Sequence, residues 1–170
     1  ASRCVNAGQN NDDLRPVYHF TRKSGEMNGP NGLMWTPGPD TPGGFPTATY
    51  HMYFESEGPG REFTPTSQLW GHARSTDLVH WMRGNQTQIN GSSGGGVALP
   101  GGFRSADGGA WRAVALSKQS VGLSLWHSED VALERWAVVN GSGSGICPGM
   151  VPDNVQAGYI GDNYVWHEPN

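Results

Sequence analysis

The chain has 170 residues, a length that suits one domain with a buried core. Its net charge of −4 and isoelectric point near 5.8 offer no basic surface for nucleic acid or anionic lipid, and no run of about 18 apolar residues predicts a membrane span. Glycine is abundant at 26 residues, tryptophan occurs seven times, and only 15% of residues are charged. This mixture favours short strands joined by tight turns over a helical bundle or a disordered chain.

The amino terminus reads Ala-Ser-Arg-Cys, with neither an initiator methionine nor an apolar leader. This is expected of a secreted protein whose signal peptide has been removed. Three N-glycosylation sequons, at Asn85, Asn90 and Asn140, fit the same expectation. We therefore predict a secreted glycoprotein.

The two cysteines, Cys4 and Cys147, lie near opposite ends of the chain. A disulfide between them would close almost the whole chain, and two buried thiols are the alternative that the sequence leaves open. The six histidines show no metal-ligand spacing, so we predict no metal site and no cofactor.

Strand signals outnumber helix signals along the chain. Segments 49–54, 111–116 and 122–127 are short, rich in β-formers and bounded by turn residues, whereas no window has a sustained helical stripe. Segments rich in proline or glycine, predicted as loops, are 36–46, 56–66 and 91–109.

A weak internal repeat is present. Ser75 and Asp77 precede Trp81 as Ser128 and Asp130 precede Trp136, with the two serines 53 residues apart, and a further copy begins near residue 163. Serine and aspartate at this spacing predict a turn in which short side chains bond to nearby backbone groups. A period near 50 residues is typical of the blades of a β-propeller.

This period predicts one all-β domain of antiparallel, propeller-like blades over residues 15–81, 82–136 and 137–170. Closed propellers have about four to eight blades, so three leave sheet faces exposed. The chain is then a fragment, a shortened stack that caps itself differently, or a homo-oligomer that completes its core with another copy.

Three segments carry a resemblance to a known family. Segment 15–21 reads Arg-Pro-Val-Tyr-His-Phe-Thr, segment 27–32 reads Met-Asn-Gly-Pro-Asn-Gly, and segment 70–81 reads Trp-Gly-His-Ala-Arg-Ser-Thr-Asp-Leu-Val-His-Trp. Together they resemble the first blade of glycoside hydrolase family 32, the invertases, inulinases and other β-fructofuranosidases. The resemblance implies a five-bladed propeller, here shortened.

The same resemblance locates three catalytic acids, and all three are replaced. The family's first loop reads Trp-Met-Asn-Asp-Pro-Asn-Gly, and Gly29 stands where its nucleophilic aspartate is expected. Segment 103–106 resembles Phe-Arg-Asp-Pro with Ser105 in place of the stabilising aspartate, and segment 145–148 resembles Trp-Glu-Cys-Pro with Ile146 in place of the acid/base. Retaining hydrolysis needs two carboxyl groups about 5 to 5.5 Å apart. We therefore predict that the parent activity is lost.

The residues that would bind sugar are largely kept. Asn28, Asn31 and Arg104 are candidates for hydrogen bonds to hydroxyl groups, and Trp70 or Trp35 for stacking on a sugar ring. The sequence thus favours a non-catalytic protein that binds fructose-containing saccharides. Two alternatives stay open: an active β-fructofuranosidase whose sequence here is incomplete or mis-assigned, and a structural or storage protein without a ligand.

Overall fold

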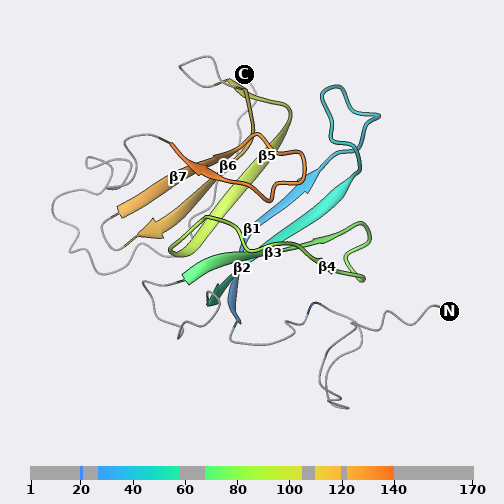
Figure 1. The fold of residues 1–170 in the computed structure, drawn as a ribbon. Helices are drawn as coiled ribbons and strands as arrows, with labels where there is room; N and C mark the ends of the chain where they lie inside the picture. The colour runs from blue at the N-terminus through green and yellow to red at the C-terminus, as the bar shows by residue number, and fades with distance from the viewer. Residues whose placement is uncertain (1–19, 21–26, 58–67, 105–109, 120–121, 140–170) are drawn as a thin grey trace, which may run out of the picture.

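The computed structural model describes Phe20 and residues 27–57, 68–104, 110–119 and 122–139 (Figure 1). These residues form eight strands in two four-stranded antiparallel sheets. The first sheet has the order β1 (Met27–Thr36), β2 (Thr49–Glu57), β3 (Gln68–Ser75), β4 (Met82–Arg83). The second has the order β5 (Ser92–Arg104), β6 (Ala110–Gln119), β7 (Gly122–Ser128), β8 (Ala137–Val138).

Each sheet is therefore an up-and-down meander in which neighbours in sequence are neighbours in space. The two first strands, β1 and β5, pack against each other (Figure 1). The short strands β4 and β8 are the last of their sheets. No helix occurs in the described part of the chain. The all-β, antiparallel prediction is confirmed.

The sheets span residues 27–83 and 92–138, whereas the first two blades were expected at 15–81 and 82–136. The third expected blade, 137–170, lies almost wholly outside the described residues, so the three-blade division stays a prediction. Predicted strands 49–54, 111–116 and 122–127 fall within β2, β6 and β7.

The loop predicted over 91–109 is wrong for most of its length, because residues 92–104 form β5. The glycines there serve close packing. A Cβ atom on Gly94 would lie 2.6 Å from the Trp70 ring, and one on Gly96 would meet the end of the Met34 side chain. Glycine in this strand allows β1 and β3 to approach β5 more closely than a larger residue would.

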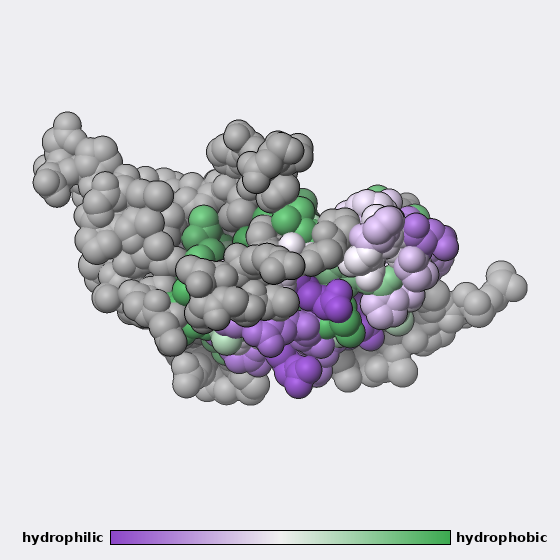
Figure 2. All heavy atoms as spheres, turned by 90° about the horizontal axis from the view of Figure 1, so that it is seen from above, coloured by the Kyte–Doolittle hydropathy of each residue, from purple (hydrophilic) through white to green (hydrophobic). Residues whose placement is uncertain are grey.

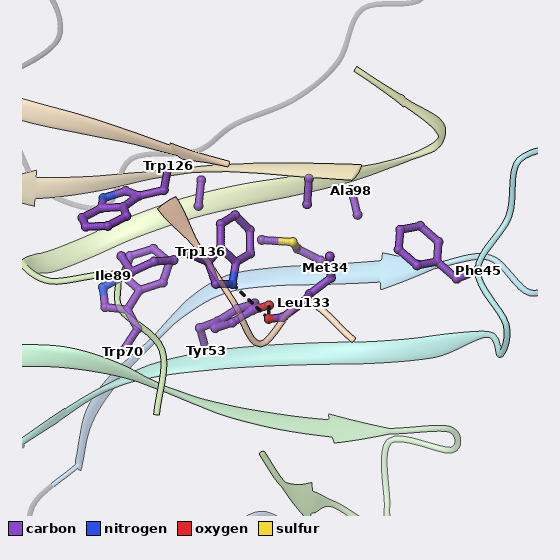
Figure 3. Packing of buried hydrophobic residues seen from close by; sticks show 11 residues of the cluster. Met34, Phe45, Tyr53, Trp70, Ile89, Ala98, Trp126, Leu133 and Trp136 are labelled. Carbon is purple, nitrogen blue, oxygen red and sulfur yellow. Dashed lines mark hydrogen bonds between the residues drawn. The ribbon is translucent and has the colours of Figure 1, made fainter. Parts of the chain in front are cut away.

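One apolar core lies between the two sheets (Figure 3). Its largest side chains are aromatic, and Tyr53 and Trp70 have no exposed surface. The Tyr53 hydroxyl and the Trp136 indole N–H both donate to the carbonyl of Leu133, at 2.7 and 2.9 Å. These two bonds satisfy the polar ends of buried rings, as burial of tyrosine and tryptophan requires. The other core residues shown in the figure are Met34, Phe45, Ile89, Ala98, Ala113, Ala115 and Trp126.

The Ser-x-Asp repeat forms the turn that the sequence predicts. The Ser75 hydroxyl accepts the backbone N–H of Asp77 at 3.1 Å, and the Ser128 hydroxyl accepts that of Asp130 at 3.2 Å. Each aspartate then accepts N–H groups further along its own turn. The short side chains thus replace the strand hydrogen bonds that end at each serine.

A second shared feature of these turns is a leucine with positive φ. Leu78 has φ 63° and Leu133 has φ 53°. The carbonyl of each accepts the indole N–H of the tryptophan that follows, Trp81 or Trp136. The second turn is two residues longer, so the leucines lie 55 apart while the serines lie 53 apart.

The described surface mixes strongly hydrophilic and strongly hydrophobic residues on the face shown in Figure 2. The large apolar side chains with the greatest exposure are Leu33, Met82, Leu78 and Trp35. Two of these, Leu33 and Trp35, belong to β1.

Candidate saccharide site

The segment that carries the predicted chemistry, residues 28–32, forms the first part of β1. Asn28, Gly29 and Pro30 are exposed, and Asn31 and Gly32 are buried. The pairing of β1 with β2 shifts register twice here, between residues 27 and 30 and between residues 31 and 34. These two irregularities bend the strand and aim its side chains differently from those of a regular strand.

Gly32 holds the base of this segment. Its φ of +48° lies in the left-handed region, which favours glycine. A Cβ atom at this position would stand 3.2 Å from both the Trp70 and the Tyr53 rings. The two buried rings therefore support the segment from below and fix the path of the chain after Asn31.

Asn31 joins the two sheets. Its Oδ1 accepts the backbone N–H of Gly94 in β5 at 3.3 Å, and its side chain is 4% exposed. Its Nδ2 group is buried and has no hydrogen-bond partner. An unpaired buried donor costs roughly 1–3 kcal/mol, which an added acceptor would recover. Asn31 is thus fixed on one side by Gly94, while its buried amide N–H group is left unpaired.

Gly29 faces open space. A Cβ atom built on it meets nothing within 4 Å, and its φ lies outside the left-handed region. The structure therefore has room for a side chain at the position where the resemblance places a nucleophilic carboxylate. Glycine is not required there by packing or by backbone geometry.

Neither of the two tryptophans proposed for stacking presents an exposed ring beside this segment. Trp70 has no exposed surface, and its indole N–H donates to the carbonyl of Gly91 at 3.1 Å, so it is a core residue. Trp35 is 52% exposed but lies six residues beyond Gly29, roughly 15–20 Å along the strand. The assignment of Trp70 as a ring-stacking residue is corrected: it supports the segment from the core.

Arg104 is also not brought to the site. Asn31 is level with Gly94 near one end of β5, whereas the backbone of Arg104 pairs with Ala110 at the other end. Ser117, which pairs with Gly94, is seven residues from Ala110, so the separation is roughly 20 Å. Asn28 and Asn31 share strand β1, and the structure does not gather the backbone of Arg104 with them.

Glu55 is a residue of this region that the sequence reasoning missed. On β2 it lies opposite residues 28 and 29, at the first register shift, and its pairing with Trp70 places it on the core-facing side. It is 4% exposed. The signal was present in the alternation of segment 49–57, which puts an acid in line with the inward residues His51 and Tyr53.

A buried histidine pair lies on the same side of the first sheet. His51 Nδ1 and His72 Nε2 are 3.0 Å apart, and the Tyr53 ring stacks on His72 with centroids 4.6 Å apart. Burial, followed by the charge of Arg74, lowers the pKa of His51 to about 4. Burial, followed by the charges of His51 and Arg74, lowers the pKa of His72 to about 3. Both rings are therefore neutral near pH 7, which suits a structural polar contact inside the core.

The remaining predicted positions divide by location. Ser105, Ile146, Cys4, Cys147 and Asn140 lie outside the described residues. Asn85 and Asn90 are exposed, and the Asn85 amide donates to Glu134 at 3.0 Å. Within the described ranges no group of three metal-ligating side chains is present. The same residues include no helix long and apolar enough to cross a membrane.

Comparison with known proteins relates the first part of the chain to a family. A family model described as the Glycosyl hydrolases family 32 N-terminal domain matches residues 19–93, which include the site segment and the whole first sheet. Residues 19–93 are a glycoside hydrolase family 32 segment. The resemblance carried by segments 27–32 and 70–81 is thereby confirmed.

Individual relatives of this family 32 segment agree. An invertase of Schizosaccharomyces pombe is 40% identical over 75 residues, which cover 44% of this chain and 11% of that protein. An extracellular exo-inulinase of Aspergillus niger is 40% identical over 67 residues, which cover 39% of this chain and 10% of that protein. The matched segment therefore spans about a tenth of these relatives.

The fold of a solved β-fructofuranosidase matches more of the chain. The β-fructofuranosidase of Schwanniomyces occidentalis, complexed with fructosyl-erythritol, superimposes with a TM-score of 0.53 at 25% identity. The match covers 76% of this chain and 26% of that one. The two described sheets are thus propeller-type blades, and they correspond to about a quarter of the enzyme.

Proposed function

We propose that this chain is a saccharide-binding relative of the β-fructofuranosidases that does not hydrolyse its ligand. The observation that carries the proposal is Gly29. It occupies an exposed position with open space around it, in a segment whose flanking asparagines are retained. A site that keeps its hydrogen-bonding frame but lacks the attacking carboxylate can bind a fructoside without cleaving it.

The contacts with sugar are assigned to two amides. Asn28 is exposed and can donate to and accept from hydroxyl groups of the ligand. The Nδ2 group of Asn31 is buried without a hydrogen-bond partner, and a sugar hydroxyl that enters beside Asn28 would supply its acceptor. Glu55 lies on the paired strand β2, opposite residues 28 and 29. Its carboxylate can accept a hydrogen bond from a sugar hydroxyl.

The proposed ligand class is a fructose-containing saccharide. The support is the relationship to proteins named invertase and exo-inulinase, together with the Schwanniomyces enzyme that was solved with fructosyl-erythritol. Loss of hydrolysis follows from composition: glycine, serine and isoleucine at positions 29, 105 and 146 can neither attack an anomeric carbon nor donate a proton to the leaving oxygen.

Isothermal titration calorimetry with sucrose, inulin oligomers and levan oligomers tests this proposal. We expect saturable heat from at least one of them at millimolar sugar. Asn28→Ala should weaken binding about fivefold, since one hydrogen bond to a hydroxyl contributes about 1 kcal/mol. Thr47→Ala, an exposed polar change in the β1–β2 connection, is the matched control and should leave affinity unchanged. Absence of heat with all three sugars would remove the proposal.

We also propose that the protein is secreted and carries N-glycans. The support is the sequons at Asn85, Asn90 and Asn140, and the relative described as an extracellular exo-inulinase. Expression in a eukaryotic host should yield protein in the medium whose mass falls after treatment with an endoglycosidase. Retention in the cell, or an unchanged mass, would contradict this.

A further inference from the structure

The first sheet has a second face, directed away from the core, that exposes large apolar side chains. Leu33 and Trp35 alternate with the buried Met34 and Thr36, so they point to the side opposite the core. They are 64% and 52% exposed. Trp35 pairs with Tyr50, which places Tyr50 on the same side. Met52, two residues further along β2, follows it. We call these four residues the outer face.

The outer face is covered at one end and open at the other. Phe54, the next residue of β2 on this side, is 1% exposed, and the Phe20 ring lies 4.9 Å from its ring centroid. Tyr50 and Met52 are half-buried, and exposure is greatest at Leu33 and Trp35. Arg83 pairs with Ala73 at the outer edge of the same side, where an interface would have its polar rim.

The repeat between the sheets indicates what fits this face. When Ser75 is aligned with Ser128, the pairs Tyr50–Ser75 and Met52–Ala73 correspond to Ala113–Ser128 and Ala115–Trp126. In the second sheet this side is buried, because Ala113, Ala115 and Trp126 pack in the core against the first sheet. The outer face is thus the counterpart of a surface that the fold covers with another sheet.

The covering surface has a counterpart too. In the core, the first sheet covers the second with the side that carries Tyr53 and His72, which pair with each other. The corresponding pair in the second sheet is Leu116–Leu125, two half-buried apolar residues on the side away from the core. One copy of the sequence therefore contains both halves of a sheet-on-sheet contact, one at each end of the described stack.

From this correspondence we propose that the outer face binds the last sheet of a second copy of the chain. A symmetric dimer would use the same contact twice, because two-fold symmetry places the outer face of each copy against the last sheet of the other. Burial of Leu33 and Trp35 drives the association.

Sedimentation velocity and light scattering on protein from a non-glycosylating host test the inference. At about 100 µM, we expect a mass that is a multiple, two or more, of the 18.2 kDa chain, and dissociation on dilution. Leu33→Asp should raise the dissociation constant at least tenfold, because it places a charge in an apolar contact. Leu78→Asp, a change at a similarly exposed leucine in a turn, is the matched control and should associate like the unmodified chain.

Circular dichroism of each variant establishes that it is folded before its mass is interpreted. A monomer at all concentrations would overturn the inference, as would equal effects, or no effect, of the two aspartate variants. The proposed saccharide site lies elsewhere on β1, so failure here leaves the sugar titration unaffected. Failure of the titration likewise leaves the mass measurement unaffected.

Discussion

The Nδ1 atom of His51 accepts a hydrogen bond from the Nε2–H group of His72 across 3.0 Å, in rings inclined by only 3°. The direction follows from the neighbours. The Thr36 hydroxyl donates to the carbonyl of Thr49 at 3.1 Å, so it accepts from His51 Nε2 at 3.2 Å. His51 Nδ1 is then unprotonated. This leaves His72 Nδ1 as a bare nitrogen, consistent with its lack of a hydrogen-bond partner.

This pair predicts acid lability. The pKa of His51 is about 4 in the folded chain against 6.5 as the reference, so the unfolded state binds more protons between these values. The contribution of His51 to the free energy of unfolding should be complete above pH 6.5. It should fall by about 3 kcal/mol as the pH drops toward 4. Urea titrations at several pH values measure this. His51→Gln should make the dependence shallower while leaving the part that comes from His72, and a flat profile in the unmodified chain would contradict the account.

Position 29 should tolerate a side chain that position 32 does not. Gly29→Ala should change the unfolding free energy by no more than about 0.5 kcal/mol, since the added methyl group meets open space. Gly32→Ala should cost about 1–3 kcal/mol, since it forces a left-handed φ on alanine and crowds two buried rings. Urea midpoints of this matched pair are the measurement. Equal costs would show that the base of the site segment is not held as described.

Restoring one carboxylate should not restore catalysis. Gly29→Asp fits the open space, yet a retaining mechanism also needs an acid to protonate the leaving oxygen, and the resemblance places isoleucine there. We expect a folded variant without measurable sucrose hydrolysis. Turnover by Gly29→Asp, absent from Gly29→Ala, would mean that another carboxyl group, with Glu55 the first to examine, acts as the acid.

Trp70 and Trp35 should differ sharply when truncated. Trp70→Ala removes a fully buried ring and its hydrogen bond to Gly91, and should cost about 3–5 kcal/mol. Trp35→Ala removes a half-exposed ring and should cost far less in the monomer. Thermal unfolding at low protein concentration measures both. Comparable losses would contradict the assignment of Trp70 to the core and Trp35 to the surface.

Leu78 is strained for a leucine. Its φ of 63° is in the left-handed region, where asparagine is better tolerated, and the side chain is exposed. Leu78→Asn should therefore stabilise the chain by up to about 1 kcal/mol. Val79→Asn, next in the same turn at ordinary φ, should not. A loss of stability in Leu78→Asn would argue that the turn needs the leucine side chain.

Much of the fold can be predicted from short sequence patterns. The alternating strands and the Ser-x-Asp turns depend on local chemistry, so their structure could be predicted from neighbouring residues alone. The glycines of β5 were predicted to form a loop. They instead allow close packing against Trp70 and Met34, which belong to other strands and therefore leave no local signal.

The site was harder to predict for a related reason. Family resemblance located Asn28 and Asn31 on one strand, but it could not say that Arg104 lies at the far end of β5 or that Trp70 is enclosed. Both depend on register and on packing between sheets. Glu55 was not predicted as a site residue because its position opposite residues 28 and 29 depends on the pairing of β2 with β1.

Sucrose hydrolysis by the homogeneous recombinant 170-residue chain is the most direct test of the central claim, that the site binds without cleaving. Released glucose should not exceed the protein-free blank, at any protein concentration. Glucose release that rises in proportion to the amount of chain would contradict the account, because it would require a pair of catalytic carboxyl groups that positions 29, 105 and 146 do not supply.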